Sequence, residues 1–301
     1  MKIFYTDRYV LPLPDGHTFP MEKYRLLRER VDASGLVRDD EKVVPHAVGL
    51  RELLLAHDAD YALAAIKGGL TDSEMRRIGF PWSAWLIERS RRSAGATTEG
   101  CFAAIEDGFA VNLAGGTHHA FRDHGEGYCV FNDSVVAARC VQRAGKIQRI
   151  AVIDCDVHQG NGTAAICRLN PSIFTFSIHG ARNYPTRKEI GDLDIELADG
   201  TGDREYLDRL EVGVRQTMER SRAQLAIYLA GADPFEGDRL GRMKLTREGL
   251  SERDRVVFEA CAAYGVPLVV TMAGGYARDI ADIVDIHWQT VRRAIAAHRG
   301  R

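Results

Sequence analysis

Short apolar runs alternate along the chain with segments whose apolar residues recur at helical spacing. The apolar runs are rich in β-branched residues and nearly continuous, which is typical of strands covered on both faces of a sheet. They predict strands over residues 2–6, 109–113, 149–154, 173–178, 192–197, 224–230 and 267–272. The helical spacing predicts helices over residues 22–30, 46–57, 82–106, 134–144, 205–220, 248–264 and 280–298. Thr71-Asp72-Ser73-Glu74 is a capping box and predicts one further short helix.

The alternation of strands and helices predicts the fold class. It favours an α/β protein with three layers, in which helices flank a central, mostly parallel sheet. No Pro-, Gly- or Ser-rich linker, low-complexity tract or internal repeat divides the chain, so we expect residues 1–301 to form a single domain. Ligands of open parallel sheets bind beyond the carboxyl ends of the strands, so polar residues at those ends are the candidates for chemistry.

Two carboxylates and an imidazole follow one of these strands. Residues 150–153 are apolar and lead into Asp154, Asp156 and His158, which point to the same face if the strand stays extended. Gly160-Asn161-Gly162 would then end the strand in a turn. Burying three such groups together is costly unless a cation compensates them. We therefore expect Asp156 and His158 to be two ligands of a metal ion.

The third ligand is expected from another strand end. A catalytic zinc takes three protein ligands and leaves one position open. Asp233 follows the strand at 224–230, and Gly231-Ala232 before it leave room for an ion beside the backbone. A helix cap or a turn ahead of Pro234 is the alternative role for Asp233. Because Gly231 and Phe235 lie two residues away from it, this strand offers no Asp-x-Asp pair. We infer one transition metal, with zinc favoured over Fe(II), Co(II) or Mn(II).

A tandem histidine, His118-His119, follows a Gly-Gly-Thr sequence after the strand predicted over 109–113. Such a pair is typical of general acid–base chemistry near neutral pH, although adjacent histidines on a loop also occur by chance. Each ring needs a partner for its other nitrogen, and Asp154 and Asn161 flank the metal-binding segment. Because Asn161 carries no charge, the histidine that it holds should be less basic than the one held by Asp154.

Tyr276 follows Ala273-Gly274-Gly275 after the last predicted strand. The glycines permit a sharp turn that aims the phenol at the strand ends, where its hydroxyl could stabilise an oxyanion. A packing role is the alternative. Neither this segment nor Gly160-Asn161-Gly162 matches a phosphate-binding glycine motif, so we discount a phosphate site.

Composition narrows the class of protein further. The chain is 45% hydrophobic and 27% charged, as in ordinary globular proteins, and its net charge of −2 provides no field that attracts nucleic acid or acidic membranes. Cysteines occur without CxxC spacing, and neither a signal-peptide pattern nor a membrane-spanning apolar stretch is present, so we expect a cytoplasmic protein with reduced thiols. The basic run at 89–92 is expected on a solvated helix face.

Together these residues resemble the zinc-dependent histone deacetylase superfamily, whose fold is arginase-like. The matching segments are residues 115–132, 152–163, 228–238 and 272–277, which span most of the chain in the family's order. Residues 17–24 and 159–162 look like the class IV branch, because other branches usually carry Asp at the position of Asn161.

The resemblance implies a role for each matching position. The implied zinc ligands are Asp156, His158 and Asp233. The implied catalytic residues are His118, His119 and Tyr276. The implied walls of the tunnel that holds an acyl-lysine stem are Gly127, Tyr128 and Tyr184. A buried potassium ion is implied around Asp154, Asp156, His158, Ser177 and Ile178.

The implied activity is hydrolysis of an acylated amine, with acyl-lysine in a protein or peptide as the leading substrate. The class IV resemblance adds long acyl chains, such as myristoyl, to acetyl. A deacylase of small molecules such as acetylated polyamines is the alternative, and Asp123, Glu126 and Glu236 could then form an acidic tunnel mouth. A non-catalytic acyl-lysine binding module is a third possibility.

The sequence departs from the family at the tunnel rim. Many relatives carry an acidic residue there, upstream of the first motif, whereas residues 78–82 contain no Asp. Peptide recognition is therefore expected to be looser, or to use Asp123, Glu126 or backbone groups. The sequence carries no signal for the oligomeric state.

Overall fold

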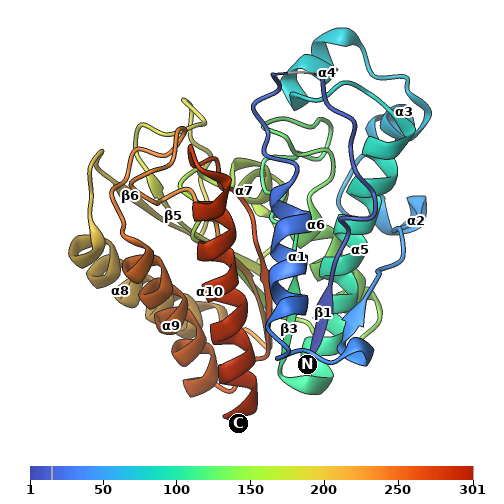
Figure 1. Ribbon diagram of the computed structural model, residues 1–301. Helices are drawn as coiled ribbons and strands as arrows, with labels where there is room; N and C mark the ends of the chain where they lie inside the picture. The colour runs from blue at the N-terminus through green and yellow to red at the C-terminus, as the bar shows by residue number, and fades with distance from the viewer. Residues whose placement is uncertain (15, 301) are drawn as a thin grey trace.

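A parallel sheet forms the centre of the computed structural model, which describes residues 1–14 and 16–300 (Figure 1). Within these residues the strand order is β2-β1-β3-β8-β7-β4-β5-β6, and every neighbouring pair is parallel. The strands are β1 (Lys2–Phe4), β2 (Lys42–Val43), β3 (Phe109–Asn112), β4 (Ile150–Asp154), β5 (Ile173–Gly180), β6 (Leu193–Leu197), β7 (Leu225–Leu229) and β8 (Leu268–Thr271).

Helices cover both faces of the sheet and complete three layers. They are α1 (Lys23–Ala33), α2 (Leu50–Leu53), α3 (Ala59–Lys67), α4 (Asp72–Ile78), α5 (Ala84–Asp107), α6 (Asp133–Arg143), α7 (Asn161–Cys167), α8 (Asp203–Ser221), α9 (Arg247–Ala263) and α10 (Ile280–Arg299). Figure 1 shows α1, α8, α9 and α10 together, with α5 and α6 beyond the sheet. Strand side chains alternate between two cores: Ala151 and Ile153 pack on the α8–α10 side, and Ile150 and Val152 on the α5–α6 side.

The predicted fold class is confirmed, and the predicted strands are all present with ends within two residues of those expected. The helix predicted over 46–57 is wrong, because only Leu50–Leu53 are helical. The backbone N–H groups of His46 and Val48 bond instead to Glu99 (2.7 Å) and to the Arg91 carbonyl (3.1 Å), which ties this segment to α5 in an extended form. The short strand β2 and helices α3 and α7 were not predicted.

The expectation that one strand carries Asp156 and His158 is also wrong. Strand β4 ends at Asp154, and α7 begins at Asn161, where a simple turn was expected. Side-chain carboxylates interrupt the ladder: Asp154 accepts the N–H of Asp156 (3.1 Å), and Asp233 accepts the N–H of Val157 (2.9 Å). The two predicted ligands therefore lie in a loop whose path is set by carboxylates of the site itself.

The basic run at 89–92 does not form a solvated face as expected. Arg89 is buried and its guanidinium lies 4.2 Å from the centroid of the Tyr24 ring. Arg91 donates to the Val48 carbonyl and Arg92 to the Pro45 carbonyl, each at 2.7 Å. These side chains hold the segment before α2 against α5, because carbonyls without strand partners need donors.

All six cysteines are buried free thiols. Among the described residues, no helix has both the length and the apolar character needed to cross a bilayer.

Candidate metal centre and active site

The predicted site residues follow four strands that are neighbours in the sheet. Strands β3, β8, β7 and β4 lie side by side, so their carboxyl-terminal loops meet at one edge. The loop after β3 carries His118 and His119, and the loop after β8 carries Tyr276. Asp233 follows β7, and the pair Asp156 and His158 follows β4. Residues far apart in the chain are thus brought together at the centre of the sheet.

Asp156, His158 and Asp233 form a compact, buried group. Their potential ligand atoms all lie within 4.8 Å of one another. Nδ1 of His158 is 3.0 Å from Oδ1 of Asp156 and 3.2 Å from Oδ2 of Asp233. Burial and then the charge of Asp156 raise the pKa of the Asp233 carboxyl to about 7. The interior therefore disfavours two carboxylate charges at this point unless a cation joins them.

This group fits a metal ion in its donors and in its surroundings. Oδ2 of Asp233 is buried and accepts no hydrogen bond from the described residues, and its ion-pair contact is with Nδ1 of His158, another potential ligand atom. A Cβ added to Gly274 would lie 2.0 Å from that oxygen and 2.5 Å from Oδ2 of Asp156, so only glycine leaves space there. One imidazole and two carboxylates form a donor set typical of zinc.

A buried arginine on α9 holds the loops that carry the three ligands. Nη1 of Arg253 donates to the carbonyl of Gly231 (2.5 Å) and lies 3.4 Å from the carbonyl of Cys155. These residues precede Asp233 and Asp156 in their loops. Asp254 balances the charge of Arg253 at 2.8 Å. The ligand loops after β4 and β7 are therefore fastened to one guanidinium.

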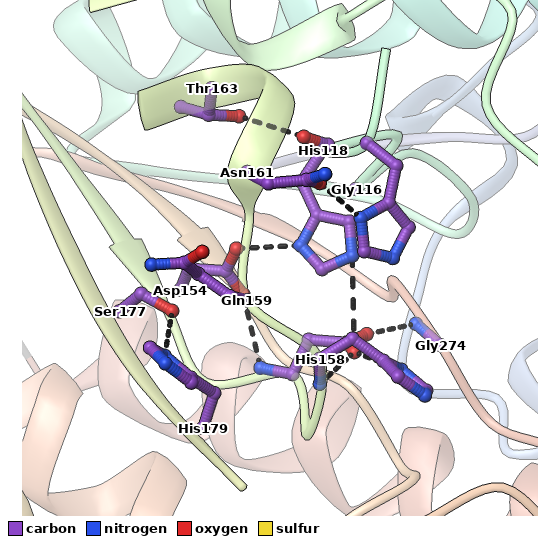
Figure 2. Close-up of polar contacts among 12 residues, drawn as sticks. Gly116, His118, Asp154, His158, Gln159, Asn161, Thr163, Ser177, His179 and Gly274 are labelled. Atoms are coloured by element: carbon purple, nitrogen blue, oxygen red, sulfur yellow. Dashed lines mark hydrogen bonds and ion pairs between the residues drawn. The ribbon is translucent and has the colours of Figure 1, made fainter. Parts of the chain in front are cut away.

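His118 pairs with Asp154, as predicted. Its Nδ1 lies 2.6 Å from Oδ2 of Asp154, a bond drawn in Figure 2. Burial of the imidazole opposes protonation, but the charges of Asp154 and Asp156 outweigh it and raise the pKa of His118 to about 9. The contact with Asp154 therefore favours the protonated form of His118.

His119 pairs with Asn161, the second predicted partner. Its Nδ1 lies 2.6 Å from Oδ1 of Asn161. Burial, followed by the positive charges of His118 and His158, lowers the pKa of His119 well below its usual value. The direction of this difference agrees with the one predicted from Asp154 and Asn161, and the neutral form is favoured for His119.

Two groups that the sequence reasoning missed support the tandem-histidine loop. The Asp133 carboxylate, which is fully buried, accepts the N–H groups of Gly116 (3.0 Å) and Thr117 (2.7 Å). The buried His57 ring bonds to the Phe121 carbonyl (2.8 Å) and accepts the Asn132 N–H (3.0 Å). Burial lowers the pKa of His57 to about 4, so the ring is neutral. Asp133 could have been identified from the sequence, because it directly follows the segment at 115–132, which is rich in site residues.

A narrow inner cavity of about 50 Å³ brings the expected groups together. Its lining includes the three metal-ligand candidates, both histidines, Gly127, Tyr128 and Tyr276. The Tyr276 backbone is held by Asp238, which accepts its N–H (2.6 Å), and by Arg239, which donates to its carbonyl (2.9 Å). Phe19 and Tyr24 also line this cavity, although the sequence reasoning gave them no role.

An outer cavity continues from the inner one toward solvent, and the two share His119, His158, Gly127, Tyr128 and Tyr276. Tyr184 stands in its wall, with its ring centroid 4.9 Å from that of His119. Arg76 and Arg77, both exposed, line its mouth, and no acidic residue of the described chain belongs to its lining. Asp123, Glu126 and Glu236, which were considered for an acidic mouth, are not among the residues that line this cavity.

The residues implied for potassium lie at the end of β4, in the loop that follows it and on the neighbouring strand β5. Asp154 pairs in register with Ser177, and the Ser177 hydroxyl lies 2.9 Å from Nδ1 of His179 (Figure 2). Asp154, Asp156, His158, Ser177 and Ile178 are all buried.

Comparison with known proteins shows a family match over most of the chain. The histone deacetylase domain matches residues 17–291. An uncharacterized protein of Picosynechococcus sp. is 41% identical over 95% of this chain and 95% of its own length. Histone deacetylase 2 of Arabidopsis thaliana is 28% identical over 95% of this chain and 78% of its own. A histone deacetylase-like amidohydrolase of Pseudomonas aeruginosa is 29% identical over 88% and 74%.

Solved structures share the fold. An HDAC homologue complexed with SAHA superposes with a TM-score of 0.83 at 22% identity, covering 99% of this chain and 88% of its own. An HDAC homologue from Aquifex aeolicus gives a TM-score of 0.83 at 23% identity, covering 100% and 84%.

Proposed function

The chain belongs to the histone deacetylase family, and from this premise we propose that it is a zinc-dependent hydrolase that removes acyl groups from the side-chain amine of lysine in proteins or peptides. One observation carries the proposal: the Asp156, His158 and Asp233 group, the histidine pair and Tyr276 line the same inner cavity. A bound zinc ion would supply Lewis-acid polarisation of the acyl carbonyl and activation of water.

The two histidines divide the proton transfers. His119 is neutral and holds its Nδ1 against Asn161, so its Nε2 is the atom that accepts a proton from the attacking water. His118 stays protonated through its contact with Asp154 and places a positive charge beside the reaction. One of the two histidines then protonates the leaving amine.

Tyr276 acts on the acyl oxygen. Burial raises the pKa of its phenol well above the usual value, so the hydroxyl keeps its proton and donates a hydrogen bond. A donor placed where negative charge develops stabilises the transition state more than the substrate. Gly127 and Tyr128 would flank the lysine stem, because they line both cavities.

Lysine in a peptide suits the mouth of the outer cavity better than a free polyamine. Arg76 and Arg77 repel a small polycation, whereas a peptide with acidic residues near the acylated lysine gains two ion-pair partners. Asp123 and Glu236 are exposed but do not line the outer cavity. We also infer a class IV relationship from Asn161 and, from it, activity on long acyl chains besides acetyl. A potassium ion at Asp154 and Ser177 belongs to the same proposal.

A panel of three substrates tests the proposal on the purified, zinc-loaded protein: an acetyl-lysine peptide, a myristoyl-lysine peptide and acetylputrescine. We expect turnover of at least one peptide and weaker turnover of acetylputrescine. No turnover of either peptide would refute the lysine substrate. Reversing the mouth charge with Arg77→Glu should raise KM for a peptide with acidic flanks and lower it for one with basic flanks.

The same preparation tests the binding-module alternative. A binding module would not need three metal ligands, a proton-accepting histidine and a phenol. In this chain the residues proposed for all of these roles line one cavity, which favours the hydrolase. We expect about one equivalent of zinc per chain by metal analysis. Zinc well below one equivalent, with no recovery when zinc is added, would favour the binding module.

A further inference from the structure

Glu126 lies in the tandem-histidine loop and contacts the residue that holds His119. Oε1 of Glu126 accepts a hydrogen bond from Nδ2 of Asn161 at 2.6 Å. Oδ1 of the same amide lies 2.6 Å from Nδ1 of His119. Asn161 projects from the first residue of α7 toward the histidine pair (Figure 2). The amide is therefore bound at both ends, by Glu126 on one side and His119 on the other.

An asparagine amide has a donating end and an accepting end, and either can face a neighbour. An ionised carboxylate can only accept, so Glu126 selects the orientation in which the NH₂ group faces it. The oxygen then faces His119, whose Nδ1 must carry the proton and whose Nε2 is left with a free lone pair. If the amide turned around, its NH₂ group would face Nδ1 and favour the opposite tautomer, in which Nε2 cannot accept a proton.

His118 has no such requirement, because both oxygens of its partner Asp154 accept. Because the partner of His119 is a neutral amide with two different ends, a third residue is needed to fix its orientation. The carboxylate partner of His118 needs no such residue. We propose that Glu126 is a positioning residue that sets the tautomer of His119 through Asn161. The proposal rests on the proposed function, because the tautomer matters to turnover only if His119 accepts a proton.

The surroundings of Glu126 suit this role. Its side chain is 14% exposed, which keeps it from exchanging freely between partners in solvent. Its second oxygen lies 3.8 Å from Nε2 of His124. Burial and a hydrogen bond to Glu126 raise the pKa of Tyr184, so the same carboxylate also contacts the wall of the outer cavity.

The test combines two substitutions. Glu126→Ala should lower kcat on the peptide substrate about tenfold or more with little change in KM, a loss comparable to that seen when an outer partner of a metal-ligating histidine is removed. Glu126→Gln keeps an accepting oxygen and should recover most of the loss. In an Asn161→Asp background, Glu126→Ala should cause no loss, because a carboxylate presents an oxygen to His119 in either orientation. An equal loss of kcat in both backgrounds would overturn the proposal.

Glu106→Gln is the control for the removal of a glutamate charge. Glu106 is exposed on α5, next to the last residue of that helix, and it lies outside both cavities. This variant should keep the parental kcat, and a tenfold loss in it would mean that turnover responds to any loss of a glutamate charge, which also overturns the proposal. Unfolding midpoints of all variants identify any that lose activity by failing to fold.

A spectroscopic readout separates this proposal from the proposed function. In ¹⁵N-histidine-labelled, zinc-loaded protein, the ring nitrogens of His119, assigned by comparison with His119→Ala, should report a proton on Nδ1. Glu126→Ala should shift that ring toward a mixture of tautomers, and an unchanged Nδ1–H tautomer would overturn the proposal. If the parental protein turns over no acyl-lysine peptide, the proposed function fails, and the tautomer alone then decides the role of Glu126.

Discussion

Replacing Gly274 with alanine should weaken metal binding while leaving the fold intact. Gly274 touches the metal-ligand group in two ways. Its N–H donates to Oδ2 of Asp156 at 2.8 Å, and its Cα faces Oδ2 of Asp233 so closely that a Cβ would lie 2.0 Å from that oxygen. Because real contacts of a Cβ essentially never fall below 3.0 Å, the loop or the carboxylate must move by about an ångström.

The expected loss of zinc affinity follows from that displacement. A hydrogen bond to a charged acceptor contributes about 1.5–3 kcal/mol, and moving the loop away sacrifices it. At about 1.4 kcal/mol per factor of ten, this corresponds to zinc affinity about 10- to 100-fold weaker. Gly69→Ala is the matched control, since a Cβ there meets its nearest atom at 3.6 Å, an ordinary contact remote from the ligands.

Competition between the protein and a chromophoric zinc chelator measures the dissociation constant of each variant. We expect a weaker constant for Gly274→Ala, an unchanged one for Gly69→Ala, and unfolding midpoints within a few degrees of the parental protein for both. A Gly274→Ala protein that binds zinc as tightly as its parent would refute the placement of the ion between Asp156 and Asp233.

Three further expectations concern turnover, pH and stability. Tyr276→Phe should keep zinc content and fold but lower kcat about 10²–10³-fold, and near-parental turnover would remove the phenol from the mechanism. His57 has a folded pKa of about 4 against 6.5 when unfolded, so its neutral ring contributes stability that is complete above pH 6.5 and falls with pH toward 4. Between pH 6.5 and 5, the free energy of unfolding measured with urea should fall by about 2 kcal/mol more in the parental protein than in His57→Gln. An equal pH dependence of this free energy in the two proteins would contradict the role of His57. Arg253→Met should destabilise the fold by about 3–5 kcal/mol in the same assay, because Asp254 is left buried without its cation; a loss below about 1 kcal/mol would show that Asp254 needs no such partner.

The chemistry of the site was largely readable from local sequence. Carboxylates, imidazoles and a phenol directly after apolar runs identify strand ends, because buried strands tolerate such groups only where the sheet stops. The unequal basicity of His118 and His119 followed from the different charges of Asp154 and Asn161. The resemblance to one family was also carried by these short segments, and the match over residues 17–291 agrees with it.

What the sequence by itself determined is thus the set of elements and the groups at their ends, since side-chain periodicity and turn residues act over a few positions. The tertiary structure decided which ends become neighbours. The order β3-β8-β7-β4 is set by packing between segments that are distant along the chain, and no local pattern encodes it. The same packing ended β4 at Asp154, brought Arg76 and Arg77 to the mouth of the outer cavity and turned the Asn161 amide toward Glu126. Each outcome depends on contacts between loops, whose partners exist only once the sheet has formed.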